Sequence, residues 1–570
     1  MAKNHGLSIA ICGQAGQGIK TVEGLLQLLF HRAGLHVFTT KEYMSRIRGG
    51  MNSTTVRVSS RPVRALRAGL DVALILDRGG ADHLGERISP ETVVAGEEDD
   101  LTPEEKGRGV FLAVPWRAIA KELGGSFYLN TAAAGVLAGL LAADREAMAS
   151  AVAEKFSAKG EEVAGKNREA FGRGFDAGER FRKDRDLELS LPSPAGEAGK
   201  VIFNGAEAVA LGALAGGCNF LSFYPMSPAT GVGVFIAGQA GELGVEVEQA
   251  EDEIAAANMA LGAWYAGGRG LVTTSGGGFA LMVESLSLAG VTETPLVIHL
   301  GQRPGPGTGL PTRTEQGDLL FTLFAGHGDF PRIILAPGSV EEAFYLTREA
   351  FNLADRFQVP VIVLTDQYLL DSYRDLAPFD LSGFEVENSF VETGPDYRRY
   401  ALTEDGISPR GIPGRGEGLV RADSDEHDEY GRITEDAAVR AAMVEKRFRK
   451  LAEIEKEVPE PEYSGPENCR TLIIGWGSTR EAVREALEEA GLESAGHLHF
   501  SRLFPLPPGL KDRLEKAERL VAVENNATGQ FADLIELRTG VKIERRILKA
   551  DGGPFTVEEL AESLKKEAAR

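Results

Sequence analysis

The sequence predicts an α/β protein built from three α/β domains. Over most of its 570 residues, short apolar runs of strand type alternate with segments whose apolar residues have helical spacing. This alternation is typical of parallel sheets covered by helices. Two changes of composition divide the chain: a charged stretch that ends in the Pro- and Gly-rich segment 191–199, and a loop-rich region over 391–465. At roughly 100–200 residues per domain, the length suits three or four domains.

The first predicted domain covers residues 1–190. Its strand candidates are residues 7–13, 36–40, 54–60 and 72–77, and residues 21–34 have helical spacing. Residues 155–190 are rich in charge, which predicts an exposed helix that leads into a linker.

The second predicted domain covers residues 200–390 and is expected to be a parallel sheet with helices between its strands. Its strand candidates are residues 220–225, 270–275, 296–301, 332–337 and 359–366. Residues 391–465 are predicted to be a linker with a long charged helix. A smaller α/β domain over 466–570 starts with the strand pattern LIIGW.

Composition excludes several kinds of protein. The formal net charge of -22 argues against a nucleic-acid partner, because phosphate backbones need a basic face. Cys12, Cys218 and Cys469 are far apart and form no CxxC pair, so no disulfide framework, metal site or iron–sulfur cluster is expected on this chain. No run of about 18 apolar residues and no signal-peptide pattern is present, which predicts a cytoplasmic protein without a membrane span.

A glycine-rich turn follows the first predicted strand. Gly13, Gly16 and Gly18 leave backbone N–H groups free to face an anion at a helix N-terminus. The spacing fits neither a P-loop, since Ile19 separates Gly18 from Lys20, nor the dinucleotide pattern G-x-G-x-x-G. A phosphate-bearing ligand and a plain strand-to-helix turn both remain open.

A basic loop follows in the same domain. Lys41, Arg46 and Arg48 lie beside a Gly pair, within a strongly acidic chain. The loop could bind an anionic ligand or an acidic partner surface, or it could simply be solvated.

Four motifs in the second domain each follow a predicted strand. The segment FYPMSPAT presents Ser227, an acidic cluster contains Glu253, three glycines occupy 276–278, and Arg303 begins the Gly- and Pro-rich loop RPGPGTGLPTRTEQGDLL. Ligand sites in parallel sheets gather at the carboxyl ends of strands. Arg303 could hold a carboxylate in bidentate fashion, with hydroxyl groups added by the loop threonines, Thr308, Thr312 and Thr314.

Each of these motifs also has a structural explanation. Prolines alone can account for the turn before Ser227, and the helix dipole accounts for Glu251 and Asp252. Tight turns account for the glycines. A carboxylate of Glu253 that points inward could instead bond a cofactor ring nitrogen.

The order of the motifs carries more information than any one of them. YPMSPAT, EDEIAAANMALGAWYAGGR, TSGGGFALMVE, RPGPGTGLPTRTEQGDL and GHGDFPRIILAPGS resemble, in sequence, the α subunit of 2-oxoacid:ferredoxin oxidoreductases. GQAGQG and YMSRIRGGMNS resemble the γ domain of these enzymes, and LIIGWGS, FPLPP and VENNATGQF resemble their transketolase C-terminal-like domain. The chain is most similar to the fused γ–α subunit of the 2-oxoglutarate enzyme.

The resemblance implies a reaction and roles for the motif residues. In this family thiamine diphosphate attacks the 2-oxo carbon, carbon dioxide leaves, coenzyme A takes the acyl group, and single electrons pass through iron–sulfur clusters to ferredoxin. By resemblance, the second domain binds the cofactor's pyrimidine ring and Glu253 bonds that ring. Arg303 and Thr312 hold the substrate carboxylate, and Ser227 contacts the substrate or the cofactor edge. The other implied cofactor-binding positions are Tyr224, Pro225, Gly276, Gly277, Gly13, Gly16 and Gly18, together with Arg46 and Arg48, which could face coenzyme A.

The chain itself offers half of such a site. A magnesium–diphosphate motif would contain G-D-G, which the sequence lacks, and cluster-binding cysteines are also missing. The resemblance therefore implies a β subunit that brings Mg²⁺ and a 4Fe-4S cluster, in an α2β2 heterotetramer. YPMSP and SGGGF differ from the family patterns Y-P-I-T-P and S-G-P-G-F, which leaves the substrate open.

Other functions stay open at this stage. Pyruvate or a branched-chain 2-oxoacid could be the substrate. An indolepyruvate-type enzyme fits less well, because those chains carry their own cluster cysteines. A non-catalytic docking scaffold and a nucleotide-binding protein built on the turn at Gly13 are the remaining alternatives, and the sequence does not give the physiological direction.

Overall fold

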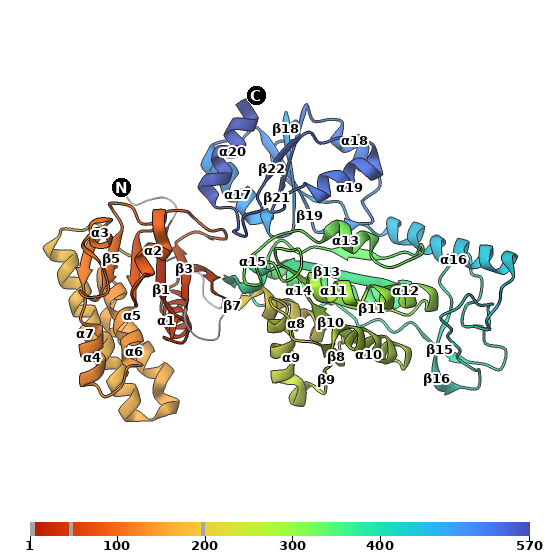
Figure 1. Cartoon of the computed structure of the whole chain (residues 1–570), viewed down its shortest axis with the longest axis horizontal. Coiled ribbons are helices and arrows are strands. Elements are labelled where there is room, and N and C mark those ends of the chain that lie inside the picture. The colour runs from red at the N-terminus through yellow and green to blue at the C-terminus, as the bar shows by residue number, and fades with distance from the viewer. Residues whose placement is uncertain (1–5, 45–49, 195–199, 570) are drawn as a thin grey trace. The chain divides into compact units, whose positions relative to one another are not determined.

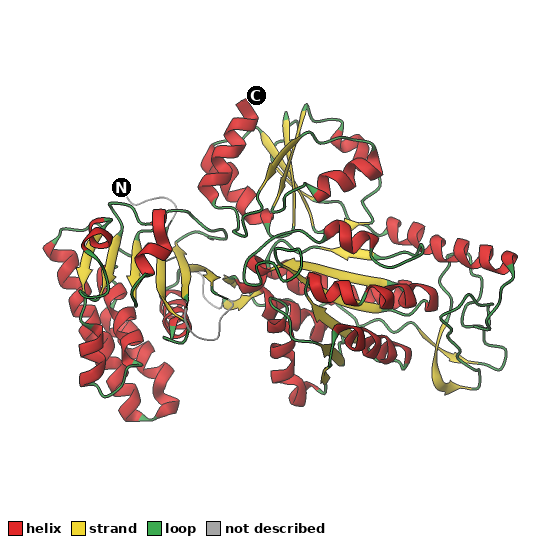
Figure 2. Ribbon diagram, in the orientation of Figure 1, coloured by secondary structure: helices red, strands yellow, loops and turns green. Residues whose placement is uncertain are grey.

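The structure is a computed structural model that describes residues 6–44, 50–194 and 200–569 (Figure 1). The chain divides into two compact units. Unit 1 comprises Met1–Ile202, Ser372–Pro378 and Thr556–Glu558, and unit 2 comprises Phe203–Asp371, Phe379–Phe555 and Glu559–Arg570. Strands alternate with helices in both units, which confirms the predicted α/β class (Figure 2). The predicted boundaries of the three domains and the linker remain a prediction.

Unit 1 is built on a mixed sheet, in which strands follow the order β6-β5-β4-β1-β3-β2-β14-β7, with β7 (Val201–Asn204) as the last strand. Its strands are β1 (Leu7–Gln14), β2 (His36–Glu42), β3 (Met51–Ser59), β4 (Val72–Ile75), β5 (Val93–Gly96), β6 (Val110–Ala113) and β14 (Tyr373–Leu376). Its helices are α1 (Ile19–Arg32), α2 (Gly80–Leu84), α3 (Pro103–Gly107), α4 (Trp116–Glu122), α5 (Tyr128–Leu140), α6 (Arg145–Phe156) and α7 (Glu161–Asp184). β1, β4, β5 and β6 pair in parallel, whereas β3 lies antiparallel to both β1 and β2.

The prediction of an exposed helix over 155–190 is wrong for one face of α7. Ala170, Phe171, Gly174, Phe175 and Gly178 are buried on that face. Cβ atoms placed on Gly174 and Gly178 would lie 2.1 Å from carbonyl oxygens of α5. The glycines therefore let two helix backbones approach closely, and the high charge of the other face hides this spacing in the sequence.

Unit 2 contains a second sheet with the order β20-β12-β13-β11-β10-β8-β9, in which only β20 is antiparallel to its neighbour. The chain enters unit 2 through β7 (Val201–Asn204). The strands are β8 (Phe220–Phe223), β9 (Glu246–Gln249), β10 (Gly270–Thr274), β11 (Leu296–Gln302), β12 (Ile333–Leu335), β13 (Pro360–Asp366) and β20 (Arg502–Phe504). The helices that accompany them are α8 (Gly205–Ala215), α9 (Thr230–Leu243), α10 (Glu253–Tyr265), α11 (Gly276–Leu281), α12 (Val283–Thr292), α13 (Leu319–Phe324), α14 (Val340–Phe357) and α15 (Gln367–Asp371). The six parallel strands confirm the parallel sheet expected here.

The rest of unit 2 adds two smaller sheets. β15 (Phe390–Thr393) and β16 (Arg410–Gly416) pair with each other, and α16 (Ala437–Lys456) is the long charged helix expected in this region. The C-terminal sheet has the order β17-β19-β18-β21-β22. Its elements are β17 (Glu462–Ser464), β18 (Thr471–Trp476), β19 (Ala495–Phe500), β21 (Arg519–Glu524), β22 (Arg545–Leu548), α17 (Thr479–Ala490), α18 (Leu510–Leu514), α19 (Gln530–Thr539) and α20 (Val557–Ala569).

One hydrophobic core joins the parallel sheet of unit 2 to the C-terminal sheet. It contains Ile298 and Leu300 of β11 together with Trp476 and Leu498 of the C-terminal strands. Because these side chains share one core, the two sheets pack as parts of the same compact body.

Candidate active site

Four adjacent parallel strands place the four motifs at one edge of the large sheet. In the order β11-β10-β8-β9, each strand pairs in parallel with the next. Ser227 follows β8, Glu253 follows β9, residues 276–278 follow β10, and Arg303 follows β11. The carboxyl ends of these strands therefore bring together segments that lie far apart in the sequence, from Ser227 to Arg303.

Glu253 is a buried carboxylate at the start of α10. Only 3% of the residue is exposed, and its Oε1 atom makes no hydrogen bond with the described residues. Burial raises the pKa of Glu253, and the charge of Asp252 raises it further. Asp252 has a structural role, since it caps the helix by accepting a hydrogen bond from the Ala255 N–H at 2.8 Å.

Gly278 forms a wall of the space beside Glu253. A Cβ atom at this position would lie 2.2 Å from Thr274 Oγ1 and 2.5 Å from Glu253 Oε1. Any side chain here would displace the carboxylate, so this glycine allows Glu253 to occupy its position.

Gly276 and Gly277 complete the turn into α11. A Cβ atom on Gly276 would lie 2.6 Å from Asp318 Oδ2. On Gly277 it would make only ordinary van der Waals contacts, with Met226 Sδ at 3.9 Å and the Gly307 carbonyl oxygen at 4.0 Å. The turn thus has a carboxyl group at each end and an accessible backbone between them.

Arg303 links two of the loops at this edge. Its Nη1 donates a hydrogen bond of 2.7 Å to the backbone carbonyl of Ser227. Burial lowers the pKa of Arg303, and the nearby carboxylate of Asp318 acts in the opposite direction. The guanidinium is therefore a half-buried cation in which a second nitrogen remains for an anion.

The threonines of the loop have different surroundings. Thr308 is exposed and Thr312 is half-buried. Thr314 is buried, and its hydroxyl accepts a hydrogen bond from the Tyr368 N–H and contacts Asp366. Thr314 therefore serves the protein interior, whereas Thr308 and Thr312 are the loop hydroxyls that remain accessible.

Asp318 is a site residue that the sequence motifs did not single out. Its Oδ2 is buried and has no hydrogen-bond partner among the described residues. Burial raises the pKa of Asp318 to about 6, Glu315 raises it further, and Arg303 opposes the rise. Its place at the end of the Gly- and Pro-rich loop was the available signal, but the sequence does not show which acidic residue of that loop is buried.

The remaining predicted positions are less enclosed. Tyr224 is 41% exposed, and Pro225 beside it is also exposed. In unit 1, Gly16 and Gly18 have positive φ angles of 92° and 86°, a conformation that favours glycine. Gly13 lies just before the same turn, which leads into α1. Arg46 and Arg48 lie outside the described residues.

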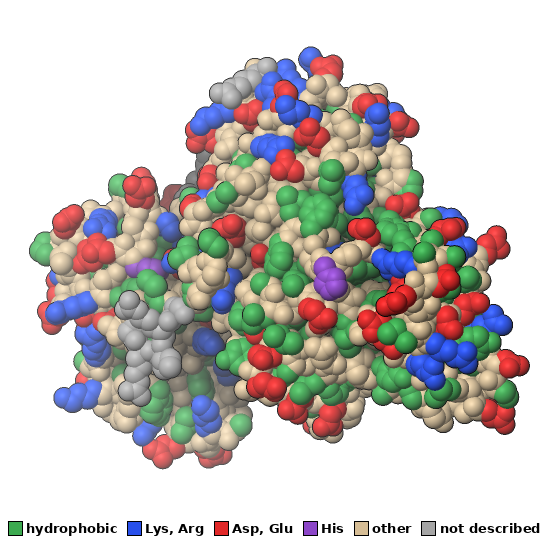
Figure 3. Space-filling model, turned by 45° about the vertical axis from the view of Figure 1, so that its right-hand side comes forward, with side chains coloured by type: hydrophobic (Ala, Val, Ile, Leu, Met, Phe, Trp, Pro, Cys, Tyr) green, Lys and Arg blue, Asp and Glu red, His purple; other side chains and the backbone are tan. Residues whose placement is uncertain are grey.

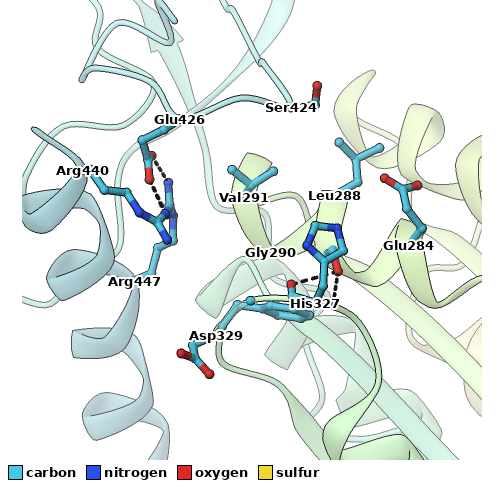
Figure 4. A pocket seen from close by; sticks show the side chains of 13 residues that line it. Glu284, Leu288, Gly290, Val291, His327, Asp329, Ser424, Glu426, Arg440 and Arg447 are labelled. Atoms are coloured by element: carbon cyan, nitrogen blue, oxygen red, sulfur yellow. Dashed lines mark hydrogen bonds and ion pairs between the residues drawn. The ribbon is translucent and has the colours of Figure 1, made fainter. Parts of the chain in front are cut away.

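Unit 2 also contains a cavity of about 220 Å³ beside α12 and α16 (Figure 4). Glu426 forms ion pairs there with Arg440 and Arg447, while Glu284 and His327 line another side. None of the predicted site residues lines this cavity.

The described residues offer neither a metal-binding cluster nor a membrane-spanning helix. No group of three or more His, Cys, Asp or Glu side chains in the described ranges could hold a metal ion. Within the same ranges, none of the helices combines the length and apolar character needed to span a membrane.

Family comparisons match both units. The family described as "Pyruvate ferredoxin/flavodoxin oxidoreductase" matches residues 8–177. The family described as "Pyruvate flavodoxin/ferredoxin oxidoreductase, thiamine diP-bdg" matches residues 211–446. The second match includes all four motifs at the sheet edge.

Curated relatives match either nearly the whole chain or a large part of it. The 2-oxoacid:ferredoxin oxidoreductase subunit alpha of a Sulfolobus species is 33% identical over 623 aligned positions, which cover 98% of this chain and 96% of that protein. The 2-oxoglutarate synthase subunit KorA of Archaeoglobus fulgidus is 34% identical over 338 positions, 59% of this chain and 90% of that protein.

A solved structure has the same fold over its full length. The 2-oxoglutarate:ferredoxin oxidoreductase from Magnetococcus marinus, determined with 2-oxoglutarate, coenzyme A and succinyl-CoA bound, superposes with a TM-score of 0.92. The identity is 32%, and the match covers 99% of this chain and 100% of that one.

Proposed function

Because this chain belongs to the family of 2-oxoacid:ferredoxin oxidoreductase α subunits, we propose that it works with a β subunit to decarboxylate a 2-oxoacid oxidatively. Coenzyme A would take the acyl group and ferredoxin the electrons. The resemblance carried by the sequence motifs is confirmed by relatives that align over 98% of the chain. The observation that carries the site proposal is the buried Glu253, whose Oε1 has no hydrogen-bond partner among the described residues, at the edge where all four motifs meet.

The thiamine diphosphate-binding domain of the family lies over residues 211–446. The residues present fit the pyrimidine end of this cofactor, since Glu253 Oε1 has no partner in the described part of the chain and Gly278 leaves the space beside it free of a side chain. When bound, thiamine diphosphate supplies a nucleophilic carbon for the 2-oxo group. Glu253 would hold a proton at Oε1 and exchange it with the ring nitrogen, for which a raised pKa is suitable. The backbone of Gly276 and Gly277 would contact the ring.

Arg303 would bind the carboxylate of the 2-oxoacid. Its hydrogen bond to the Ser227 carbonyl fixes the guanidinium at the sheet edge, and Thr312 is an accessible hydroxyl of the same loop. Tyr224 and Pro225 are proposed to line the cofactor side, where their exposure leaves them available to a ligand or partner. The Ser227 hydroxyl is proposed to face the substrate or the cofactor edge.

In unit 1, the turn of Gly13, Gly16 and Gly18 is proposed to bind a phosphate of coenzyme A. This proposal is supported by the N-terminus of α1, where Gly18 is the N-cap and makes no side-chain cap hydrogen bond within the described residues. Arg46 and Arg48 are proposed as cationic partners for the same ligand, on sequence grounds alone.

The incomplete cofactor site supports a β subunit as partner. Several large apolar side chains of unit 2 are exposed, and Figure 3 shows that hydrophobic side chains are spread over this part of the molecule. They include Ile254, Met259, Leu281, Phe321 and Phe324, on α10, α11 and α13, which begin at or beside the site. Such exposure is typical of a surface that another protein covers. Mg²⁺, the 4Fe-4S cluster and the α2β2 stoichiometry are proposed for the complex, and the cytoplasmic location stays a prediction.

The proposal is tested by isolating the chain with its native partners under anaerobic conditions. We expect a smaller protein that contains iron and a G-D-G motif to co-purify. The complex should reduce a viologen dye with 2-oxoglutarate and coenzyme A, faster than with pyruvate or a branched-chain 2-oxoacid. A faster reaction with one of those acids would correct the substrate. An isolated, iron-free chain without such a partner would contradict the proposal.

The carboxyl group of Asp318 lies near Arg303, so we predict that the affinity for the substrate depends on pH. Below its pKa of about 6, Asp318 is neutral and Arg303 is free for the substrate carboxylate. Above this pH, the ionised Asp318 competes for Arg303, so KM for the 2-oxoacid should rise by about fivefold between pH 5.5 and 7.5. Asp318→Asn should flatten this profile.

The matched control for this prediction is Glu315→Gln, which removes a half-buried carboxyl from the same loop but leaves Asp318 and Arg303 in place. This variant should retain a pH-dependent KM. A wild-type profile in Asp318→Asn would show that another group titrates.

A further inference from the structure

The C-terminal domain holds the loop that begins with Arg303. Gln316 is fully buried, and each of its polar groups bonds a residue of that domain. Its backbone N–H donates to the Asn525 carbonyl at 2.6 Å, while its side-chain Oε1 accepts from the Asn525 N–H at 2.9 Å. Its Nε2 donates to the Trp476 carbonyl at 2.9 Å, and its carbonyl accepts from Asn526 Nδ2 at 3.1 Å.

Gln530 makes a second attachment close to the first. Its Nε2 donates to the Gly317 carbonyl at 2.7 Å, and its Oε1 accepts from the Leu320 N–H at 2.9 Å. These two bonds hold the residues on both sides of Asp318. A third attachment is the hydrogen bond of 3.0 Å from the Thr314 N–H to the Gly552 carbonyl.

The segment 524–530 is itself held firmly. Buried Glu524 accepts hydrogen bonds from the backbone N–H groups of Phe531 and Ala532 and from Asn526 Nδ2. Its other donor is Trp476 Nε1 at 3.2 Å. Because the carboxylate is fully enclosed by donors, the segment forms a fixed platform at the start of α19.

The loop has little regular secondary structure of its own. Residues 303–318 contain no helix or strand, and residues 305–310 are exposed. Its internal bonds include those from the Leu310 N–H to the Pro304 carbonyl and from the Arg313 N–H to the Leu310 carbonyl. The course of its second half is therefore set by the C-terminal domain.

We propose that Asn525, Asn526 and Gln530 of the VENNATGQF motif position the Arg303 loop for substrate binding, with Gln316 and Gln530 as positioning residues. This inference rests on the proposed role of Arg303 as the carboxylate clamp. It gives the C-terminal domain a direct part in 2-oxoacid binding. Neither glutamine needs to touch the substrate, since each acts through the backbone of the loop.

The test uses Gln530→Ala in the complete complex with the β subunit. Gln530 is only half-buried, so its loss should leave the fold intact, whereas Gln316→Ala removes a fully buried side chain and provides a second, more severe variant. Loss of the two loop bonds should raise KM for the 2-oxoacid about tenfold, with kcat within about threefold and KM for coenzyme A unchanged. Gln530→Glu keeps the acceptor for the Leu320 N–H and should recover part of the loss.

The matched control is Thr528→Ala in the same motif, since Thr528 is exposed and its backbone N–H donates to Asn526 Oδ1 rather than to the loop. This variant should have wild-type kinetics. Hydrogen exchange of the backbone over residues 303–320 should be faster in Gln530→Ala than in this control.

The outcomes separate the two proposals. If the wild-type complex oxidises no 2-oxoacid, the proposed function fails. If the wild-type complex is active and Gln530→Ala retains both its KM and its exchange rates, the positioning role is wrong. A loss of kcat and thermal stability without a selective rise in KM would indicate a purely structural contact and would also overturn it.

Discussion

Glu253→Ala is expected to lower kcat of the complex by at least about 10²-fold, the range for loss of a group that moves a proton in the reaction. Glu253 Oε1 has no partner among the described residues and lies at the edge of the sheet where the four motifs meet. The raised pKa of this carboxyl suits a group that both holds and releases a proton. The measurement is viologen reduction at saturating 2-oxoacid, coenzyme A and thiamine diphosphate.

The same substitution should not destabilise the fold. A buried polar group without a hydrogen bond costs about 1–3 kcal/mol, so removing it should leave the free energy of unfolding unchanged or raise it. Asp252→Ala provides the contrast, because loss of the helix cap should lower stability by about 1 kcal/mol while kcat is retained. Full activity of Glu253→Ala would exclude it from the chemistry.

Arg303→Ala is expected to raise KM for the 2-oxoacid by about 10²-fold or more, because a charge-assisted bond to a buried carboxylate contributes about 2–5 kcal/mol. The guanidinium is half-buried and is fixed through the Ser227 carbonyl at 2.7 Å. KM for coenzyme A should stay within a small factor of the wild-type value. Steady-state kinetics of the complex, with the 2-oxoacid varied at fixed coenzyme A, would measure both.

Arg303→Lys distinguishes the charge from the geometry. Lysine keeps the positive charge but cannot bond Ser227 and a carboxylate through one planar fork, so KM should lie between those of the wild type and the alanine variant. Arg538→Ala removes an exposed arginine of α19 and serves as the control for overall charge. Wild-type KM in Arg303→Ala would refute the clamp.

Much of the architecture could be predicted from local sequence patterns. The strand candidates at 220–225, 270–275, 296–301 and 359–366 correspond to β8, β10, β11 and β13, because short, mainly apolar runs are strongly patterned. The burial of one face of α7 was determined by long-range packing. The small residues of that face pack against α5, whereas the charged residues of the other face dominate the composition of the helix.

The sequence by itself determined the order of the motifs and the type of sheet. It also indicated that the carboxylate of Glu253 could point inward and bond a cofactor. The tertiary structure decided which groups meet. It placed Glu253 and Asp318 at the two ends of the glycine turn and paired Arg303 with the Ser227 carbonyl. It also connected the Arg303 loop, through hydrogen bonds of Gln316, to Asn525, which is more than 200 residues away in the sequence. Such contacts depend on how two sheets share one core, and residue spacing along the chain carries no record of that packing.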